Sequence, residues 1–207
     1  MFQTLSDRER IAVQHYDEIV RQGNLTDTAV WVDDFTGRVY LDLAPEDEVV
    51  DIGCRLGRFV PLLPQLGISR YLGIDPSVES ITYCKRTYAE IDYCQVHFES
   101  GEARLLGRQY PERFAGFMLA AVLMHIPRTC LQDVLVSIRQ CLKFGAQGFF
   151  STPLGEDGGD LEVVNRQGLE LSLYTEKELV EGFTQAGFTF VRTIYPSNMI
   201  LGHVVAI

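Results

Sequence analysis

The stretch Val49-Val50-Asp51-Ile52-Gly53-Cys54-Arg55-Leu56-Gly57-Arg58 decides how the chain folds. Its first residues, with the preceding Glu48, predict a short apolar strand, and Gly53 and Gly57 lie in the loop that leaves this strand. Glycines in such a loop let the backbone approach a ligand, because they carry no Cβ atom. A helix that follows the loop turns unpaired N–H groups toward the same place. The segment therefore predicts a strand, a ligand-binding loop and a helix in succession.

The alternation of strand and helix repeats along the chain. Strands are predicted at residues 48–52, 71–75, 94–98, 114–120 and 147–151, and helices at 58–66, 76–89, 128–142 and 175–187. Two further β-rich runs, 188–194 and 200–207, predict an antiparallel hairpin. Strands that alternate with helices form a parallel sheet with both faces covered. We expect an α/β fold with a doubly wound, mostly parallel seven-stranded sheet, a C-terminal antiparallel hairpin and helices on both faces.

Two regions lie outside this pattern. Ser6 and Glu9 fit a capping box that begins a helix over residues 6–22. After it the sequence is mixed, with a turn at 36–37, and we predict that 1–44 forms an N-terminal helical cap segment on a single domain spanning 1–207. The stretch 153–173 breaks the rhythm of strands and helices, and loops of this length are often functional. It is therefore a candidate cover for a substrate pocket.

Composition limits the partners that the chain can have. Its 207 residues carry a formal net charge of -10, and an acidic surface repels phosphate backbones. No apolar run reaches the roughly 18 residues that span a bilayer, and the N-terminal residues show no signal-peptide pattern. The five cysteines include no Cys-x-x-Cys pair, which favours buried thiols over disulfides or a metal site. We expect a cytoplasmic protein with a small-molecule substrate and without nucleic-acid, membrane or metal partners.

Acidic residues follow the ends of the first three predicted strands. Asp51, Asp75 and Glu102 lie at or just after these ends, where open parallel sheets bind ligands. The two aspartates could also simply cap helices. A nicotinamide enzyme would need glycine at positions 55 and 58 to complete the Gly-x-Gly-x-x-Gly fingerprint, and both positions hold arginine. A nicotinamide oxidoreductase is therefore disfavoured, although it remains an alternative that predicts NAD(H) binding.

Several motifs, taken in order, resemble those of class I S-adenosylmethionine (SAM)-dependent methyltransferases of the small-molecule type. Asp51-x-Gly53-Cys54-x-x-Gly57 is similar to the first motif of that family. Later segments are similar to its second motif, its Gly-Asp-Ala segment, its fourth strand with the loop that follows, its Leu-Lys-Pro-Gly-Gly turn and its last helix: 71–77, 100–103, 117–127, 141–146 and 174–188. The resemblance extends from about Tyr16 to the C-terminus. It implies SAM as cofactor and S-adenosylhomocysteine as product.

The resemblance also implies which residues form the site. The expected cofactor-binding residues are Asp51, Gly53, Cys54, Arg55, Gly57, Asp75, Pro76, Glu102, Ala103 and Ala120. Within this set, Asp75 is expected to bind the ribose hydroxyls and Glu102 the adenine amine. His125 follows the fourth strand and is the first candidate for a catalytic base or acceptor-positioning group, with Tyr16 and Tyr174 behind it.

Arg55 is the main departure from the family pattern. It replaces a glycine whose backbone runs beside the methionine part of SAM, and it could swing out to solvent, pair with the SAM carboxylate or obstruct the site. Because the sulfonium of SAM already activates the methyl group, a base is needed only when the acceptor is protonated. We predict a SAM-dependent methyltransferase that acts on an unidentified small molecule. The alternative is a catalytically silent binding protein with the SAM fold.

Overall fold

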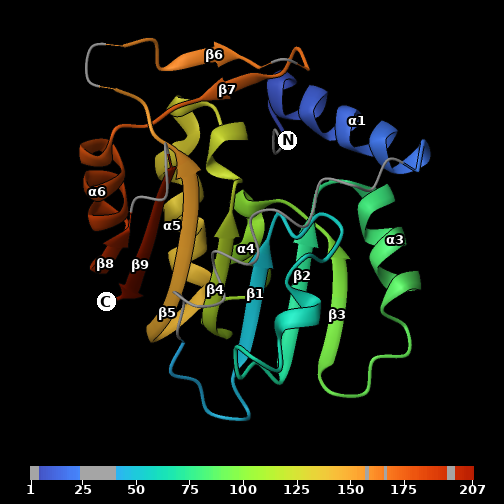
Figure 1. The fold of residues 1–207 in the computed structure, drawn as a ribbon. Coiled ribbons are helices and arrows are strands. Elements are labelled where there is room, and N and C mark those ends of the chain that lie inside the picture. Colours follow the sequence, from blue (N-terminus) through green and yellow to red (C-terminus); the bar gives the residue numbers. More distant parts are fainter. Residues whose placement is uncertain (1–4, 24–40, 157–158, 166, 195–198) are drawn as a thin grey trace.

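The computed structural model describes residues 5–23, 41–156, 159–165, 167–194 and 199–207. Within these residues, seven strands form one sheet in the order β3-β2-β1-β4-β5-β9-β8 (Figure 1). The strands are β1 (Glu48–Ile52), β2 (Arg70–Asp75), β3 (Gln95–Ser100), β4 (Phe114–Ala120), β5 (Leu142–Pro153), β8 (Phe188–Ile194) and β9 (Met199–Ala206). Strands β1 to β5 pair in parallel, and β9 pairs antiparallel with both β5 and β8. The predicted doubly wound, mostly parallel sheet with a C-terminal antiparallel hairpin is confirmed.

Five α-helices connect or cover the strands in the described part of the chain. They are α1 (Asp7–Arg21), α3 (Val78–Thr87), α4 (Leu106–Gln109), α5 (Leu131–Cys141) and α6 (Glu176–Gln185). The predicted capping box at the start of α1 is present, since the Ser6 side chain accepts from the Glu9 N–H while the Glu9 carboxylate accepts from the Ser6 N–H. None of the helices in these described ranges is long and apolar enough to cross a membrane.

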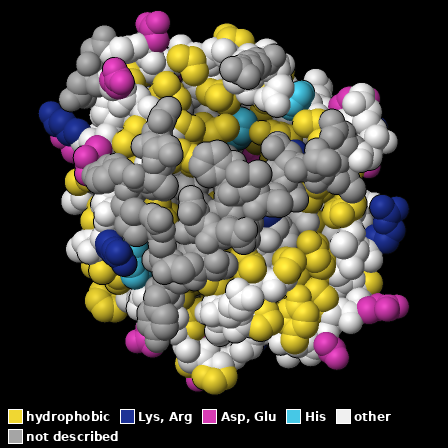
Figure 2. Space-filling model, viewed as in Figure 1, with side chains coloured by type: hydrophobic (Ala, Val, Ile, Leu, Met, Phe, Trp, Pro, Cys, Tyr) yellow, Lys and Arg dark blue, Asp and Glu magenta, His cyan; other side chains and the backbone are white. Residues whose placement is uncertain are grey.

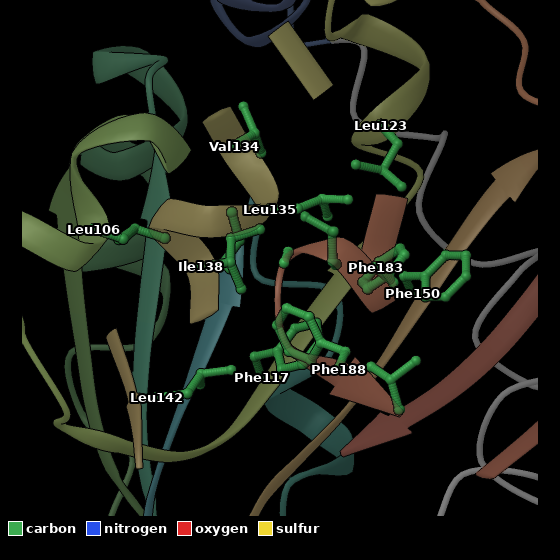
Figure 3. Close-up of a cluster of buried hydrophobic side chains, with 14 of the residues drawn as sticks. Leu106, Phe117, Leu123, Val134, Leu135, Ile138, Leu142, Phe150, Phe183 and Phe188 are labelled. Atoms are coloured by element: carbon green, nitrogen blue, oxygen red, sulfur yellow. The ribbon is translucent and has the colours of Figure 1, made fainter. Parts of the chain in front are cut away.

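Alternate side chains of the central strands enter two different cores. On β1, Val50 and Ile52 pack with the side of the sheet that α4, α5 and α6 cover, whereas Val49 points to the side of α3. Figure 3 shows the first of these cores, in which the α5 side chains lie beside Phe117, Phe150, Phe183 and Phe188. Phe150 and Phe183 stack there with ring centres 4.4 Å apart. Both faces of the sheet are therefore covered, as a parallel sheet requires.

Some predicted element boundaries were wrong. Residues 58–66 form only a three-residue 3-10 turn, η2 (Val60–Leu62), because prolines lack the N–H that a continuing helix needs. The predicted helix 128–142 begins as the 3-10 turn η5 (Arg128–Cys130) and becomes α-helical only at Leu131. Strand β5 starts directly at the end of α5, five residues before the start predicted at 147.

The predicted long loop 153–173 contains a small hairpin. Strands β6 (Glu162–Val164) and β7 (Glu170–Ser172) pair antiparallel as a second sheet. Arg8 of α1 joins this hairpin, because its guanidinium donates to the Glu170 carbonyl at 3.0 Å and to the Met124 carbonyl at 3.2 Å. In Figure 1 the hairpin and α1 lie together above the carboxyl ends of the parallel strands. They occupy the side of the sheet where ligands bind in such folds.

The remainder of the predicted N-terminal cap lies partly outside the described residues. The mixed region covers 24–44, and most of it, including the turn at 36–37, falls within 24–40, so the division of the chain at residue 44 stays a prediction. The cysteines are free thiols, and Cys130 alone among the five is partly exposed while the others are buried.

Candidate functional site

A cavity of about 530 Å³ lies between α1 and the carboxyl ends of β1, β2 and β4. Its volume falls in the range of about 300–1,000 Å³ that is usual for small-molecule sites. Its wall includes residues of the loops after β1, β2, β3 and β4 together with one side of α1. Helix α1 is fixed over this end of the sheet by Arg8 at one place and by Asp17 at another, where the Ser77 hydroxyl donates to Asp17 Oδ1 at 2.5 Å.

The loop after β1 takes the left-handed backbone conformation at three positions. The φ angles are 72° at Gly53, 48° at Arg55 and 70° at Gly57. A Cβ atom at Gly53 would lie 2.4 Å from Val122 Cγ2, and one at Gly57 would lie 2.5 Å from the Tyr88 ring. Glycine is therefore required at the outer two positions by both backbone and space. Arg55 takes a conformation that is uncommon for residues other than glycine, and such strain is typical of functional sites.

The Arg55 side chain stays at the site. Its guanidinium lies over the Tyr16 ring of α1, 4.8 Å from the ring centre, and the residue lines the cavity. The predicted outcome in which the side chain swings out to solvent is therefore wrong. With Arg55 in its wall, the cavity has a volume of about 530 Å³, so the side chain does not fill it. Pairing of the guanidinium with the SAM carboxylate stays a prediction.

Asp75 is held by the backbone of the loops around it. Its Oδ2 accepts from the Arg55 N–H at 2.9 Å, and its Oδ1 accepts from the Ser77 N–H at 2.8 Å. Burial raises its pKa, while these two hydrogen bonds and the charges of Arg58 and Arg55 oppose the rise. Each carboxylate oxygen can accept a second hydrogen bond, and Asp75 lines the cavity. The arrangement leaves it able to receive two hydroxyl groups side by side, as the predicted ribose contact requires.

Asp51 lies behind the cavity wall. Its side chain is fully buried, and its Oδ2 accepts from the Tyr71 hydroxyl at 2.7 Å. Its Oδ1 has no hydrogen-bond partner among the described residues. Burial raises the pKa of Asp51 to about 6, an increase that the Tyr71 hydrogen bond and the charge of Arg58 oppose. Arg58 itself donates to the Ala120 carbonyl at 2.6 Å, which places a cation near the two buried aspartates.

Glu102 lies in the loop after β3. It lines the wall, and its Oε2 is buried without a hydrogen-bond partner in the part of the chain that the structure describes. Burial raises its pKa, and the charge of Arg104 opposes the increase. Arg104 forms an ion pair with Glu9 of α1, so α1 is also attached to the loop after β3. The position is suited to a ligand group that donates a hydrogen bond, such as the predicted adenine amine.

His125 meets α1 at the side of the cavity that β4 approaches. It ends the turn η4 (Leu123–His125), and its Nε2 lies 3.1 Å from the Tyr16 hydroxyl. Burial lowers its pKa to about 4, and the charges of Arg8 and Arg55 add to this effect. An imidazole with such a pKa is neutral at pH 7 and a weak base. Of the two roles predicted for His125, positioning of the acceptor therefore fits better than proton removal.

The structure brings together most of the predicted site but not all of it. Six of the ten predicted cofactor residues line the cavity with His125: Gly53, Arg55, Asp75, Pro76, Glu102 and Ala103. The cavity wall does not include Asp51, Cys54, Gly57 or Ala120, so direct contact of these four with SAM stays a prediction. Tyr16 reaches the cavity, whereas Tyr174 lies outside its wall and donates to the Ile126 carbonyl at 2.9 Å.

Ala121 and Val122 are among the wall residues that were not predicted from the sequence. Ala121 lines the cavity in place of its neighbour Ala120, and it has a φ of 56°. Val122 follows it and touches the space beside Gly53. An alanine in the left-handed conformation gives no sequence signal, because nothing in its type points to that backbone.

Comparison with known proteins identifies the class to which this site belongs. Residues 49–145 match the family model described as "Methyltransferase domain", and this segment holds all ten predicted cofactor residues. The matched part of the chain is therefore a methyltransferase domain, as the resemblance to the class I SAM-dependent methyltransferases predicts, and SAM is its cofactor. No curated protein sequence matches the chain.

Solved structures share the fold over most or all of the chain. The Burkholderia thailandensis 1,6-didemethyltoxoflavin-N1-methyltransferase has a TM-score of 0.72 at 18% identity, covering 100% of this chain and 93% of that one. The partner of the Trm112 methyltransferase activator in a Haloferax volcanii complex has a TM-score of 0.71 at 16% identity, covering 99% of each chain. The [4+2]-cyclase SpnF has a TM-score of 0.72 at 17% identity, covering 92% of this chain and 76% of that one. Identities this low establish the common fold and leave the substrate open.

Proposed function

We propose that the chain transfers the methyl group of SAM to a small molecule bound in the cavity beneath α1. The observation that carries this proposal is the apolar part of the cavity wall that the predicted cofactor residues do not account for. Its apolar members include Leu5, Ala12, Val13, Met124, Ile126, Val134, Pro153 and Met199. Small-molecule sites are mostly apolar, with a few polar groups that fix orientation. Here those polar groups are Tyr16, Arg55 and His125.

The surface charge supports a small acceptor rather than a nucleic acid. The chain carries a formal net charge of -10, and nucleic-acid affinity depends on basic groups that neutralise phosphates. Figure 2 shows charged side chains mainly along the rim of one face with hydrophobic ones between them. Lys and Arg form no continuous patch among the described residues of that face. A small-molecule acceptor is also found in the Burkholderia neighbour, whose structure holds bound 1,6-didemethyltoxoflavin.

The residues of the site would orient two ligands rather than supply a reactive group. SAM supplies a methyl group that its sulfonium has already activated. Asp75 and Glu102 lie on the wall where they can fix the ribose and adenine of the cofactor. Helix α1 and the β6–β7 hairpin, joined through Arg8, cover this end of the sheet and limit access of water. Alignment of the acceptor with the methyl–sulfur bond can then provide much of the rate acceleration.

Loss of the Asp75 carboxylate is expected to weaken SAM binding by about 10- to 100-fold, because a hydrogen bond to a charged group contributes about 1.5–3 kcal/mol. Calorimetric titration of the cofactor-stripped protein with SAM and with S-adenosylhomocysteine measures this in Asp75→Ala. Asp75→Asn keeps one oxygen acceptor for the loop and should fall between Asp75→Ala and the unaltered protein. Asp133→Ala, an exposed position on α5, is the matched control. An unaltered affinity in Asp75→Ala would refute the ribose contact.

The acceptor class is tested by following a labelled methyl group. Purified protein is incubated with methyl-labelled SAM and three separate cell fractions: metabolites below a few kilodaltons, proteins and nucleic acids. We expect label in the metabolite fraction, and we expect excess S-adenosylhomocysteine to abolish it. Label that enters only the protein or nucleic-acid fraction would overturn the proposal of a small-molecule acceptor.

A further inference from the structure

We propose that Arg55, Tyr16 and His125 form one positioning unit, in which Arg55 holds the Tyr16 ring and the Tyr16 hydroxyl fixes His125 so that its Nδ1–H binds the methyl acceptor. The inference rests on the proposed function, since it names the chemistry that the acceptor must offer to this site. It assigns a role to Tyr16 and to Arg55, the arginine that departs from the family pattern in the loop after β1.

The three residues come from three separate parts of the fold. Arg55 belongs to the loop after β1, Tyr16 to the middle of α1 and His125 to the turn after β4. The Arg55 guanidinium lies 4.8 Å from the centre of the Tyr16 ring, and the Tyr16 hydroxyl lies 3.1 Å from His125 Nε2. The Tyr16 and His125 rings meet edge to face with their centres 5.5 Å apart. All three residues line the cavity, so the unit connects the loop after β1 with α1 and with the turn after β4.

Arg55 is well placed to fix the tyrosine. A guanidinium over an aromatic face attracts the ring, and the attraction grows when the pair is removed from water. The backbone of Arg55 is in turn tied to Asp75 through its N–H. The phenol therefore has a defined position relative to the predicted ribose-binding carboxylate.

The Tyr16 hydroxyl determines which nitrogen of His125 carries the proton. A phenol O–H is more acidic than a neutral imidazole N–H, so it is the better donor and Nε2 accepts. The nitrogen that accepts cannot bear the proton of a neutral ring, so the proton lies on Nδ1. Burial keeps the ring neutral, with a pKa of about 4. His125 can therefore donate a hydrogen bond through its Nδ1–H, the ring nitrogen that does not bond to Tyr16.

The Nδ1 atom of His125 is buried and has no hydrogen-bond partner among the described residues. A buried donor without a partner destabilises a protein by about 1–3 kcal/mol, so a ligand atom that accepts there, once neighbouring atoms shift to admit it, gains much of this energy. The acceptor molecule should accordingly be a mainly apolar compound with a carbonyl oxygen, an oxyanion or an unprotonated ring nitrogen that faces His125. Its nucleophilic atom should also arrive unprotonated, since a neutral donor removes no proton.

Nitrogen NMR of the histidine side chains tests the unit without either ligand. In the 15N-histidine-labelled protein, long-range 1H–15N spectra distinguish the two neutral tautomers, and the missing signals of His125→Gln assign the ring among the four histidines. We expect the Nδ1–H tautomer in the unaltered protein and a shift toward the Nε2–H tautomer in Tyr16→Phe. Tyr110→Phe, which loses a hydroxyl bonded to Glu99 instead, should leave the His125 signals unchanged.

The link to Arg55 is tested in the same spectra. Arg55→Met keeps a long side chain but removes the guanidinium, and we expect the His125 signals to move part of the way toward those of Tyr16→Phe. Nε2–H as the main tautomer in the unaltered protein, or unchanged signals in Tyr16→Phe, would overturn the proposal. Unchanged signals in Arg55→Met would remove Arg55 from the unit. These outcomes are independent of the methyl-labelling experiment, whose failure would instead count against the proposed function.

Discussion

Asp51→Asn is expected to raise the free energy of unfolding by about 2–3 kcal/mol at pH 8 and to leave it nearly unchanged at pH 4. Asp51 is fully buried, and burial raises its pKa to about 6 in the folded protein. In the unfolded chain, the carboxyl group of an aspartate has a pKa of about 3.9. The difference of about two pKa units corresponds to about 3 kcal/mol.

The sign of the effect follows from where the proton is held. Between about pH 4 and pH 6, folded Asp51 keeps a proton that the unfolded chain has released. The stabilising contribution of this proton is therefore fully present below the unfolded pKa and is lost as the pH rises through about 6. Asparagine cannot ionise, and its amide oxygen can still accept from the Tyr71 hydroxyl. The variant should thus lack this part of the pH dependence.

Urea unfolding of both proteins at one-unit intervals from pH 4 to pH 8 measures the effect. The difference between the two curves isolates Asp51, because the other carboxyls, Asp75 among them, contribute to both. Asp133→Asn, at an exposed position, is the control and should give a flat difference. A difference for Asp51→Asn that is independent of pH would contradict the assignment of Asp51 as a buried, proton-binding carboxyl.

The same variant is expected to bind SAM more weakly, by about tenfold or 1.4 kcal/mol. A carboxylate that destabilises the folded protein near neutral pH is typical of a functional position. Asp51 lies two residues before Gly53, so its negative charge is near the loop that is predicted to face the cationic cofactor, although the residue is outside the cavity wall. Greater stability with weaker binding would separate a functional role of Asp51 from a structural one.

The parts of the fold that were predictable from sequence are those that depend on local pattern. β1 and β4 begin and end at the predicted residues because each is a run of mainly apolar residues, and the positions of the acidic residues at strand ends follow from such runs. The β6–β7 hairpin was not predicted, because strands of three residues are too short to show a periodic pattern. The prediction of a helix at 58–66 was wrong for a reason that is visible in the sequence, because the segment contains Pro61 and Pro64.

The predictable part of the site consists of residues whose position depends only on their own strand and on the loop that follows it. Asp75 and Glu102 line the cavity because Asp75 ends β2 and Glu102 lies two residues after the end of β3. The contact between Tyr16 and His125 joins residues 109 positions apart, and it depends on how α1 lies over the sheet. The low pKa of His125 depends on the same arrangement, since burial and the charge of Arg8 from α1 both contribute. Neither could be deduced from spacing along the chain.

Gly53→Ala is expected to lower the free energy of unfolding by about 2–5 kcal/mol and to reduce SAM binding below detection by calorimetry. A left-handed residue with a Cβ atom costs about 1–2 kcal/mol, and overpacking typically costs a further 1–3 kcal/mol, roughly. The new Cβ would lie 2.4 Å from Val122 Cγ2, so either the loop after β1 or the loop after β4 must move. Both loops line the cavity.

A second substitution separates the two causes. Val122→Ala removes Cγ2, and the remaining Val122 Cβ would lie 3.6 Å from the Cβ atom that alanine introduces at position 53, which is ordinary contact. The double variant Gly53→Ala/Val122→Ala should therefore recover the steric part and keep only the backbone part, about 1–2 kcal/mol. Urea unfolding of the four proteins in this cycle gives the coupling energy directly. Additive effects of the two substitutions would show that the two loops do not touch at Gly53. This result would contradict the close packing of the loop after β1 against Val122.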